Sequence, residues 1–267
     1  MDGVIWHRAE TRAGDGAPWI VLVHGISQDH TIFEPYVDRL AGRHNVLLLD
    51  LPGHGRSAAV PGAFGMSEFA DAIAAVLEEV GIDRATMWGT HLGAAAALVL
   101  ACRTPARAAG LILEGPVYPG RTPPETAAFV ARVAACARTH GIAAARDLWW
   151  EEGAWFDLCR ENPVACRAAG HRTIIDRFEG APWLDAGLVS RPMPDIGPAL
   201  AALDCPVLIL NGEHDMAEFK SMAGDLAAIL PNATCTSVPG GGGFPLWEVP
   251  ETVWPMVDGF LSEQSQT

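Results

Sequence analysis

The stretch MWGTHLGAAA, residues 87–96, decides how the rest of the chain is interpreted. A short apolar run leads into Gly89, and an alanine-rich run with helical character follows Gly93. Small residues at both ends of such a junction let a strand and a helix approach closely, while the residue between them is pushed outward at strained dihedral angles. The pattern therefore predicts a sharp strand-to-helix turn with His91 at its tip.

Strands and helices alternate on both sides of this turn. The run WIVLV at residues 19–23 is apolar throughout, as expected of a strand that is buried on both faces. Strands are predicted over residues 4–10, 18–23, 45–49, 85–88, 109–113, 206–210 and 233–238, and helices over residues 31–40, 67–80 (opened by a cap at Ser67), 92–102, 219–230 and a last segment through Trp254 and Phe260. This alternation implies right-handed crossovers and an α/β fold with a mostly parallel sheet covered on both faces.

Between Pro116 and Pro198 the strand pattern gives way to helical spacing, with helices predicted over residues 126–140, 141–150 and 163–178. We interpret residues 117–197 as a helical cap inserted into a core domain made of residues 1–116 and 198–267. The cap is rich in large aromatic residues, namely Trp149, Trp150, Trp155, Phe156 and Trp183. Because these are too many for the outside of a soluble insertion, we expect several to line a pocket. Packing within the cap is the alternative.

The composition limits the partners and the compartment. The 267 residues include 18 Lys and Arg against 32 Asp and Glu, a net charge of −14 that disfavours nucleic acid and anionic membranes as partners. No signal-peptide pattern and no apolar run of about 18 residues is present, so we expect a cytoplasmic protein, either a monomer or a homodimer. Six cysteines without CxxC spacing predict free thiols, and we expect neither a metal site nor a cofactor.

Five segments together carry a resemblance to a known family: HG at residues 24–25, DLPGHGRS at 50–57, GTHLG at 89–93, GEHD at 212–215, and the glycine-rich run before Phe244. In this order and spacing they resemble the α/β-hydrolase superfamily along nearly the whole chain. The chain is most similar to its small, cofactor-free enzymes with a helical cap, such as enol-lactonases, carbon–carbon bond hydrolases, esterases and cofactorless haloperoxidases and dioxygenases. The resemblance implies the α/β-hydrolase fold and a small-molecule substrate, but not a particular reaction.

Two positions depart from the family's catalytic triad. In the family a serine at the turn attacks a carbonyl, a histidine after the last strand takes its proton, and an acid orients that histidine. The resemblance places His91 at the nucleophile position, Gly243 at the base position and Asp215 at the acid position. A departure at His91 alone would suggest deliberate inactivation. The second departure, at Gly243, favours natural divergence.

The oxyanion hole does not depend on side chains, and the resemblance assigns it to the backbone amides of Ile26 and Leu92. An imidazole at residue 91 lies near the positive end of a helix, which lowers its pKa and favours the neutral base. His91 is therefore predicted to move a proton next to a carbonyl, which is lyase, isomerase or cyclase chemistry. A covalent nucleophile and an inert residue in a dead site are the alternatives.

Further candidates lie around this turn. Glu114 ends a strand at the carboxyl edge of the sheet and is expected to act as a second acid/base or as the partner of His91, unless it caps a loop. Asp215 orients a histidine, or holds water, a substrate hydroxyl or His214. Candidates for substrate contact are His24, Ser27, His30, Trp149, Trp150, Trp155, Trp183 and Phe244. The alternatives are that His24 binds the backbone of its loop, that residues 27–30 form a solvated loop, and that His171 makes an ordinary polar contact.

The favoured function is an atypical enzyme that acts on an apolar, cyclic or polyketide-like carbonyl compound without hydrolysing it. The alternatives are an ester, lactone or carbon–carbon bond hydrolase, and a binding protein without activity. The interpretation predicts a pocket between the sheet edge and the cap that touches His91, Ile26, Leu92 and Glu114. It also predicts that His91→Ser and Gly243→His together restore some esterase activity, while either change alone does little.

Overall fold

A seven-stranded sheet forms the centre of the computed structural model, which describes residues 4–61, 64–121, 123–185 and 194–264. The strand order is β1-β3-β2-β4-β5-β6-β7, with β1 antiparallel to β3 and every other pair parallel. The strands are β1 (His7–Glu10), β2 (Trp19–Val23), β3 (Asn45–Leu49), β4 (Ala85–Thr90), β5 (Ala108–Glu114), β6 (Val207–Gly212) and β7 (Ala233–Val238). The predicted α/β fold with a mostly parallel sheet is confirmed.

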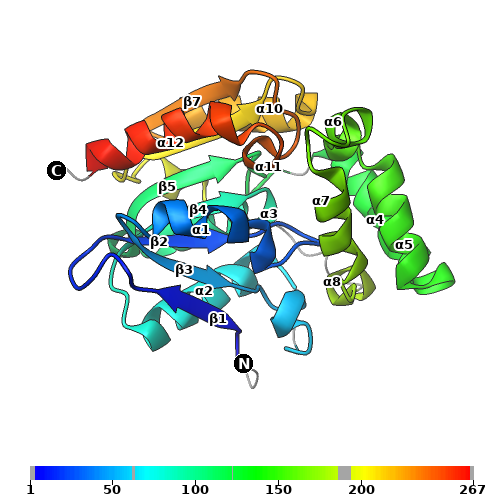
Figure 1. Ribbon diagram of the computed structural model, residues 1–267, viewed down its shortest axis with the longest axis horizontal. Helices are drawn as coiled ribbons and strands as arrows, with labels where there is room; N and C mark the ends of the chain where they lie inside the picture. The colour runs from blue at the N-terminus through cyan, green and yellow to red at the C-terminus, as the bar shows by residue number, and fades with distance from the viewer. Residues whose placement is uncertain (1–3, 62–63, 122, 186–193, 265–267) are drawn as a thin grey trace.

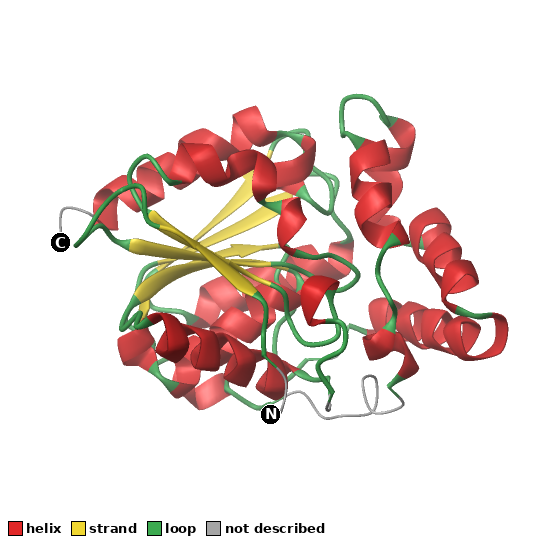
Figure 2. Cartoon of the chain, turned by 60° about the horizontal axis from the view of Figure 1, so that its bottom comes forward, coloured by secondary structure: helices red, strands yellow, loops and turns green. Residues whose placement is uncertain are grey.

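Helices lie above and below the sheet, and a further group lies beyond one end of it (Figure 2). The helices against the sheet include α1 (Glu34–Leu40), α2 (Met66–Val80), α3 (Leu92–Arg103), α9 (Gly197–Leu200), α10 (Ala217–Ile229), α11 (Pro245–Glu248) and α12 (Pro250–Gln264). The other group, which we call the cap helices, consists of α4 (Pro124–His140), α5 (Ile142–Glu152), α6 (Asp157–Glu161), α7 (Ala168–Asp176) and α8 (Ala181–Leu184). Figure 1 shows the cap helices in green beside the loops of the sheet.

Alternate residues of the buried strands supply two hydrophobic cores, one on each face of the sheet. Ile20 and Leu22 of β2 join the core that contains α1 and α12, whereas Val21 and Val23 join the core that contains α2 and α3. A strand buried on both faces needs apolar residues throughout. This is why the run WIVLV reads as uniformly hydrophobic.

Several element boundaries differ from the predictions for local reasons. The helix predicted over residues 31–40 is a 3-10 turn (His30–Ile32) followed by α1, because Pro35 fits the first turn of a helix, as in α1, but not the interior of one. The helix predicted over residues 163–178 begins only at Ala168, after Arg167 adopts a left-handed conformation with φ 50°. Helix α2 is capped by Gly65 rather than by Ser67. The sequence does not predict the short helices α6, α8 and α11, since four or five residues carry too little periodicity.

Two further observations concern the length of the helices and the state of the thiols. Within the described ranges, no helix combines the length and the apolar character needed to cross a bilayer. The six cysteines are free thiols.

Candidate active site

The strand-to-helix turn at the end of β4 has the predicted sharp geometry. His91 adopts φ 46° and ψ −108°, and its backbone amide donates a hydrogen bond of 2.8 Å to the carbonyl oxygen of Glu114. A Cβ at Gly89 would lie 2.4 Å from the Ala94 nitrogen, and one at Gly93 would lie 2.3 Å from the Val23 oxygen. Only glycine fits at these two positions, so the turn holds His91 in a strained conformation at the carboxyl edge of the sheet.

The His91 ring is fixed by one hydrogen bond. Its Nε2 lies 2.7 Å from the carbonyl oxygen of Gly243. A carbonyl oxygen only accepts, so Nε2 carries the proton and Nδ1 keeps a free electron pair. Within the described part of the chain, Nδ1 has no hydrogen-bond partner. Burial lowers the pKa of His91 to about 4, and the bond to Gly243 offsets only part of this effect, so the ring is neutral at physiological pH.

The surroundings of the His91 ring are apolar. The rings of Phe219 and Phe244 approach it edge-on with centroid distances of 4.9 and 4.7 Å. On a third side, a Cβ at Gly115 would lie 2.9 Å from Cε1 of His91. Phe244, a candidate for substrate contact, thus lies beside His91, and its contact with a substrate stays a prediction.

The position that the resemblance assigns to the base, Gly243, is closed by another residue. A Cβ at Gly243 would lie 2.5 Å from the carbonyl oxygen of Trp155 and 2.7 Å from its Cβ. Trp155 belongs to the 3-10 turn Ala154–Phe156 between α5 and α6. The cap segment thus fills the space in which a side chain at residue 243 would begin, and the Gly243 carbonyl serves as the partner of His91.

Asp215 is not paired with an imidazole. Its carboxylate accepts hydrogen bonds from Nδ2 of Asn211 at 2.9 Å and from the Met216 amide at 2.7 Å. Burial raises the pKa of Asp215 to about 6, although these two bonds oppose the shift. The neighbouring His214 side chain is more than half exposed and approaches Glu213 instead. The expectation that Asp215 orients a histidine is therefore corrected for the described residues.

Glu114 points to the start of α11 and not to His91. Its Oε1 accepts a hydrogen bond of 2.8 Å from the Leu246 amide. Burial raises the pKa of Glu114 to about 8, so its carboxyl group is protonated at neutral pH. The expected pairing of Glu114 with the His91 ring is corrected, because the geometry agrees with the alternative in which Glu114 holds a loop.

Glu248 is a buried acid that sequence reasoning does not single out. Its Oε2 accepts a hydrogen bond of 2.5 Å from the Gly242 amide, and its Oε1 lies 3.5 Å from Sγ of Cys159. Burial raises the pKa of Glu248 to about 7. Glu248 therefore fixes the glycine-rich turn next to Gly243. An acidic residue inside the apolar run FPLWEV is the signal that could have identified it.

The loop after β2 is buried and not solvated. Nδ1 of His24 donates to the Gly25 oxygen at 2.8 Å, and its Nε2 accepts from the Leu51 amide at 3.0 Å. With both ring nitrogens occupied and no exposed surface, His24 is a structural residue, and its assignment to substrate contact is corrected. Ser27 is buried at φ 62°, and its hydroxyl has no partner among the described residues.

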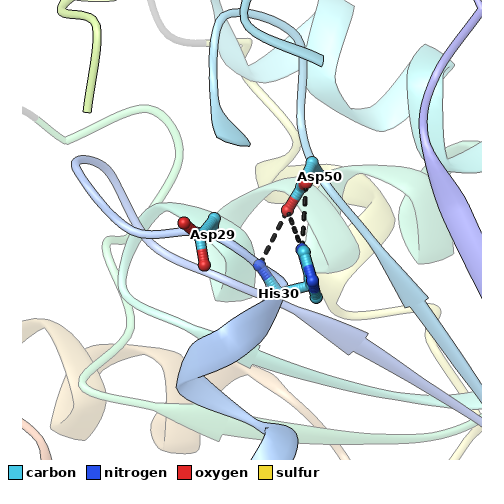
Figure 3. A group of neighbouring side chains, drawn as sticks. All are labelled: Asp29, His30 and Asp50. Atoms are coloured by element: carbon cyan, nitrogen blue, oxygen red, sulfur yellow. Dashed lines mark hydrogen bonds and ion pairs between the residues drawn. The ribbon is translucent and has the colours of Figure 1, made fainter. Parts of the chain in front are cut away.

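Asp29, His30 and Asp50 form a compact cluster beside this loop (Figure 3). His30 donates to the Asp50 carboxylate from its backbone amide at 2.7 Å and from Nδ1 at 2.9 Å, and the Arg56 amide donates at 2.8 Å. Asp29 is paired with Arg177. Since these donors already satisfy both carboxylates, we interpret the cluster as an anchor for the loop. His30 is therefore engaged within the protein rather than directed at a substrate.

The cap tryptophans pack mainly against one another. The Trp149 ring lies 4.5 Å from that of Trp155 and 5.3 Å from that of Trp183, and Trp150 lies 4.9 Å from Phe156. All four tryptophans are buried. These contacts agree with the alternative of packing within the cap. The predicted pocket stays a prediction, and residues 186–193 of the predicted cap lie outside the described part of the chain.

The backbone amides of Ile26 and Leu92 are the predicted donors of the oxyanion hole. Leu92 is the first residue of α3, so its amide has no partner within the helix. Among the described residues, neither amide donates a hydrogen bond. Their assignment to an oxyanion hole stays a prediction.

Comparisons with known proteins agree with this fold. The family model of the alpha/beta hydrolase fold matches residues 18–137. The chain is 32% identical over 235 residues to a 2-succinyl-6-hydroxy-2,4-cyclohexadiene-1-carboxylate synthase from Enterobacter sp. (strain 638), covering 84% of this chain and 87% of the relative. It is 28% identical over 254 residues to the magnesium-chelatase 30 kDa subunit of Rhodobacter capsulatus, covering 88% and 84%.

The same fold is found among solved structures. The structure of MenH from S. aureus superimposes with a TM-score of 0.85 at 22% identity and covers 97% of this chain and 98% of that chain. These matches confirm the expected fold and the expectation of an enzyme. The chain belongs to the α/β-hydrolase fold family.

Proposed function

We propose that this protein catalyses a lyase, isomerase or cyclase reaction on a carbonyl compound, with His91 as the acid/base. The observation that carries the proposal is the bond from Nε2 of His91 to the Gly243 oxygen, which leaves Nδ1 as a free base at the tip of the turn. The name of the relatives, a synthase and not a hydrolase, supports chemistry without hydrolysis.

The proposed step is the removal of a proton from the carbon next to the carbonyl group. Nδ1 of His91 accepts this proton, and the electron pair of the C–H bond moves to the carbonyl oxygen to give an enolate. The amides of Ile26 and Leu92 donate hydrogen bonds to that oxygen, and the N-terminus of α3 adds its positive potential. The enolate then takes the proton back at another carbon, expels a leaving group from the β-carbon, or attacks an electrophilic carbon in a cyclisation.

The weak basicity of His91 limits the class of substrate. A base with a pKa of about 4 matches a carbon acid whose proton is activated by a second carbonyl group or by conjugation. The rings of Phe219 and Phe244 favour an apolar molecule at this place. The relatives' name, which places an acyl group on a cyclohexadiene ring, also supports a conjugated cyclic carbonyl compound.

The test measures proton transfer directly. The protein is incubated in deuterium oxide with a cyclic β-keto ester, and deuterium incorporation above the uncatalysed background is followed by NMR. His91→Ala and His91→Gln should lower the catalysed rate by about 10²- to 10⁴-fold, the usual contribution of a positioned base. Glutamine is informative because its amide keeps a donor for the Gly243 oxygen but provides no comparable base. His140→Ala removes an exposed histidine of α4 and should leave the rate unchanged.

The rate should also fall as the pH drops through about 4, where His91 takes up a proton. Unchanged exchange in both His91 variants would contradict the proposal. A parent protein that binds the ester without exchanging its proton would instead support the binding protein without activity.

A further inference from the structure

We infer that helix α7 positions the Ile26 amide, so that the oxyanion hole is complete only while this cap helix is docked. The inference rests on the proposed function, since it concerns one of the two proposed oxyanion donors. His171 and Arg177 are the positioning residues. They lie in the first turn and directly after the end of α7, and they hold the segment of residues 25–29, which we call the Ile26 loop.

The first attachment runs through Gln28, which is almost fully buried. Its Oε1 accepts hydrogen bonds from the Gly25 amide at 2.8 Å and from Oγ1 of Thr90 at 3.2 Å, and these two donors fix the orientation of the side-chain amide. Its Nε2 therefore donates to Nε2 of His171, 3.0 Å away. One glutamine thus joins α7 both to the Ile26 loop and to the residue before His91.

The second attachment is an ion pair at the other end of α7. Nε and Nη2 of Arg177 donate to the two carboxylate oxygens of Asp29 at 2.6 and 2.8 Å. Burial alone would raise the pKa of Asp29, but the bonds from Arg177 and Thr31 lower it to about 2. The pair is therefore charged on both sides, and its two parallel bonds fix direction as well as distance. In Figure 3 the Asp29 side chain points away from the His30–Asp50 pair.

The Ile26 loop needs such support because its backbone is strained. Ser27 has φ 62°, a left-handed conformation that costs about 1–3 kcal/mol in a residue other than glycine and persists only where neighbouring contacts hold it. Residues 28 and 29, which directly follow Ser27, carry the two attachments to α7. Displacement of α7 would break both attachments and release the Ile26 amide from its place.

The experiment uses the ionisation of bound 4-nitrophenol, whose phenolate resembles an enolate and absorbs visible light. The apparent pKa of the bound phenol is obtained from its absorbance as a function of pH, and it should lie below the value of the free phenol. Arg177→Gln and His171→Phe should each weaken the preference for the phenolate by about tenfold, since complete loss of one oxyanion donor costs about 10²- to 10³-fold in rate. Arg177→Lys should restore part of the preference.

Arg172→Gln is the matched control. Arg172 lies on the same helix, but its ion pairs with Asp147 and Asp176 stay among the cap helices. This variant should bind the phenolate like the parent protein. Thermal unfolding shows which variants are folded. If Arg177→Gln does not fold, the phenolate preference of Arg177→Lys, which keeps the charge opposite Asp29, is the test in its place.

The outcomes separate the two proposals. If the parent protein does not favour the phenolate, the oxyanion hole and with it the proposed function are contradicted. If the parent favours it and the folded Arg177 and His171 variants do so equally well, the role of α7 is overturned while the proposed function stands.

Discussion

Two glycine-containing turns meet at His91, and they differ in what surrounds them. In the turn Gly89–Gly93 the backbone is packed so tightly that its glycines cannot be replaced, and only the side chain at its tip differs from the family pattern. In the turn Gly240–Gly243 the position that the resemblance assigns to the base, Gly243, is covered by the backbone of Trp155. The turn that the resemblance assigns to the nucleophile thus has an intact backbone, whereas the position that it assigns to the base has no space for a side chain.

The largest effect is expected in the first turn. A Cβ at Gly93 would lie 2.3 Å from the Val23 oxygen and 2.5 Å from the His24 oxygen, both in or next to the central strand β2. Gly93→Ala should lower the free energy of unfolding by about 3 kcal/mol or more, because the backbone of a central strand cannot move aside. Gly241→Ala in the second turn meets side-chain atoms at 3.3 Å and should cost about 1 kcal/mol or less. Chemical denaturation measures both, and equal losses would remove the contrast between the turns.

The second prediction concerns restoration of the triad. The sequence alone predicts that His91→Ser and Gly243→His together regain esterase activity. The structure corrects this expectation, because a side chain at residue 243 meets the Trp155 backbone. Gly243→His should lower the free energy of unfolding by about 2–3 kcal/mol, and the double variant should hydrolyse 4-nitrophenyl acetate no faster than His91→Ser alone.

Gly224→His is the control for this variant. Gly224 lies on the exposed side of α10, and a Cβ at this residue would have no described atom within 4 Å, so histidine there should not reduce stability. A double variant that is as stable as the parent protein and gains esterase activity would show that the Trp155 segment yields easily.

The contrast between the turns also marks what the sequence could predict. The turn at His91 depends on two glycines four residues apart, and the sheet depends on uniformly apolar runs such as residues 19–23, so both are encoded locally. The closed base position depends on Trp155, which is 88 residues before Gly243 and meets it only in the folded protein. A glycine in a motif does not reveal which distant backbone covers it.

The roles of the polar residues show the same limit. The sequence pattern places Glu114 correctly at the carboxyl edge of the sheet, but its partner is the amide of Leu246, 132 residues away. An ordinary polar contact is expected for His171, and its bond to Gln28 spans 143 residues. Position along a strand or helix follows from local pattern, whereas the direction of a buried polar side chain is set by tertiary contacts.

The last prediction concerns Glu114, whose buried carboxyl group accepts a hydrogen bond from the Leu246 amide at the start of α11. Burial raises the pKa of Glu114 to about 8, above its ordinary value of about 4.3 in an unfolded chain. The folded protein therefore holds a proton that the unfolded chain releases, so the stabilising contribution is complete below pH of about 4 and is lost as the pH rises to about 8. Glu114→Gln keeps a neutral group of similar shape and removes this dependence.

The difference in unfolding free energy between Glu114→Gln and the parent protein should therefore move in favour of the variant, by about 1–2 kcal/mol between pH values of about 6.5 and 8. Chemical denaturation across this range measures it, and taking the difference cancels the titration of groups that do not interact with Glu114. A Glu114→Gln difference that is independent of pH would mean that Glu114 is ionised in the folded protein and that a buried charge holds the start of α11.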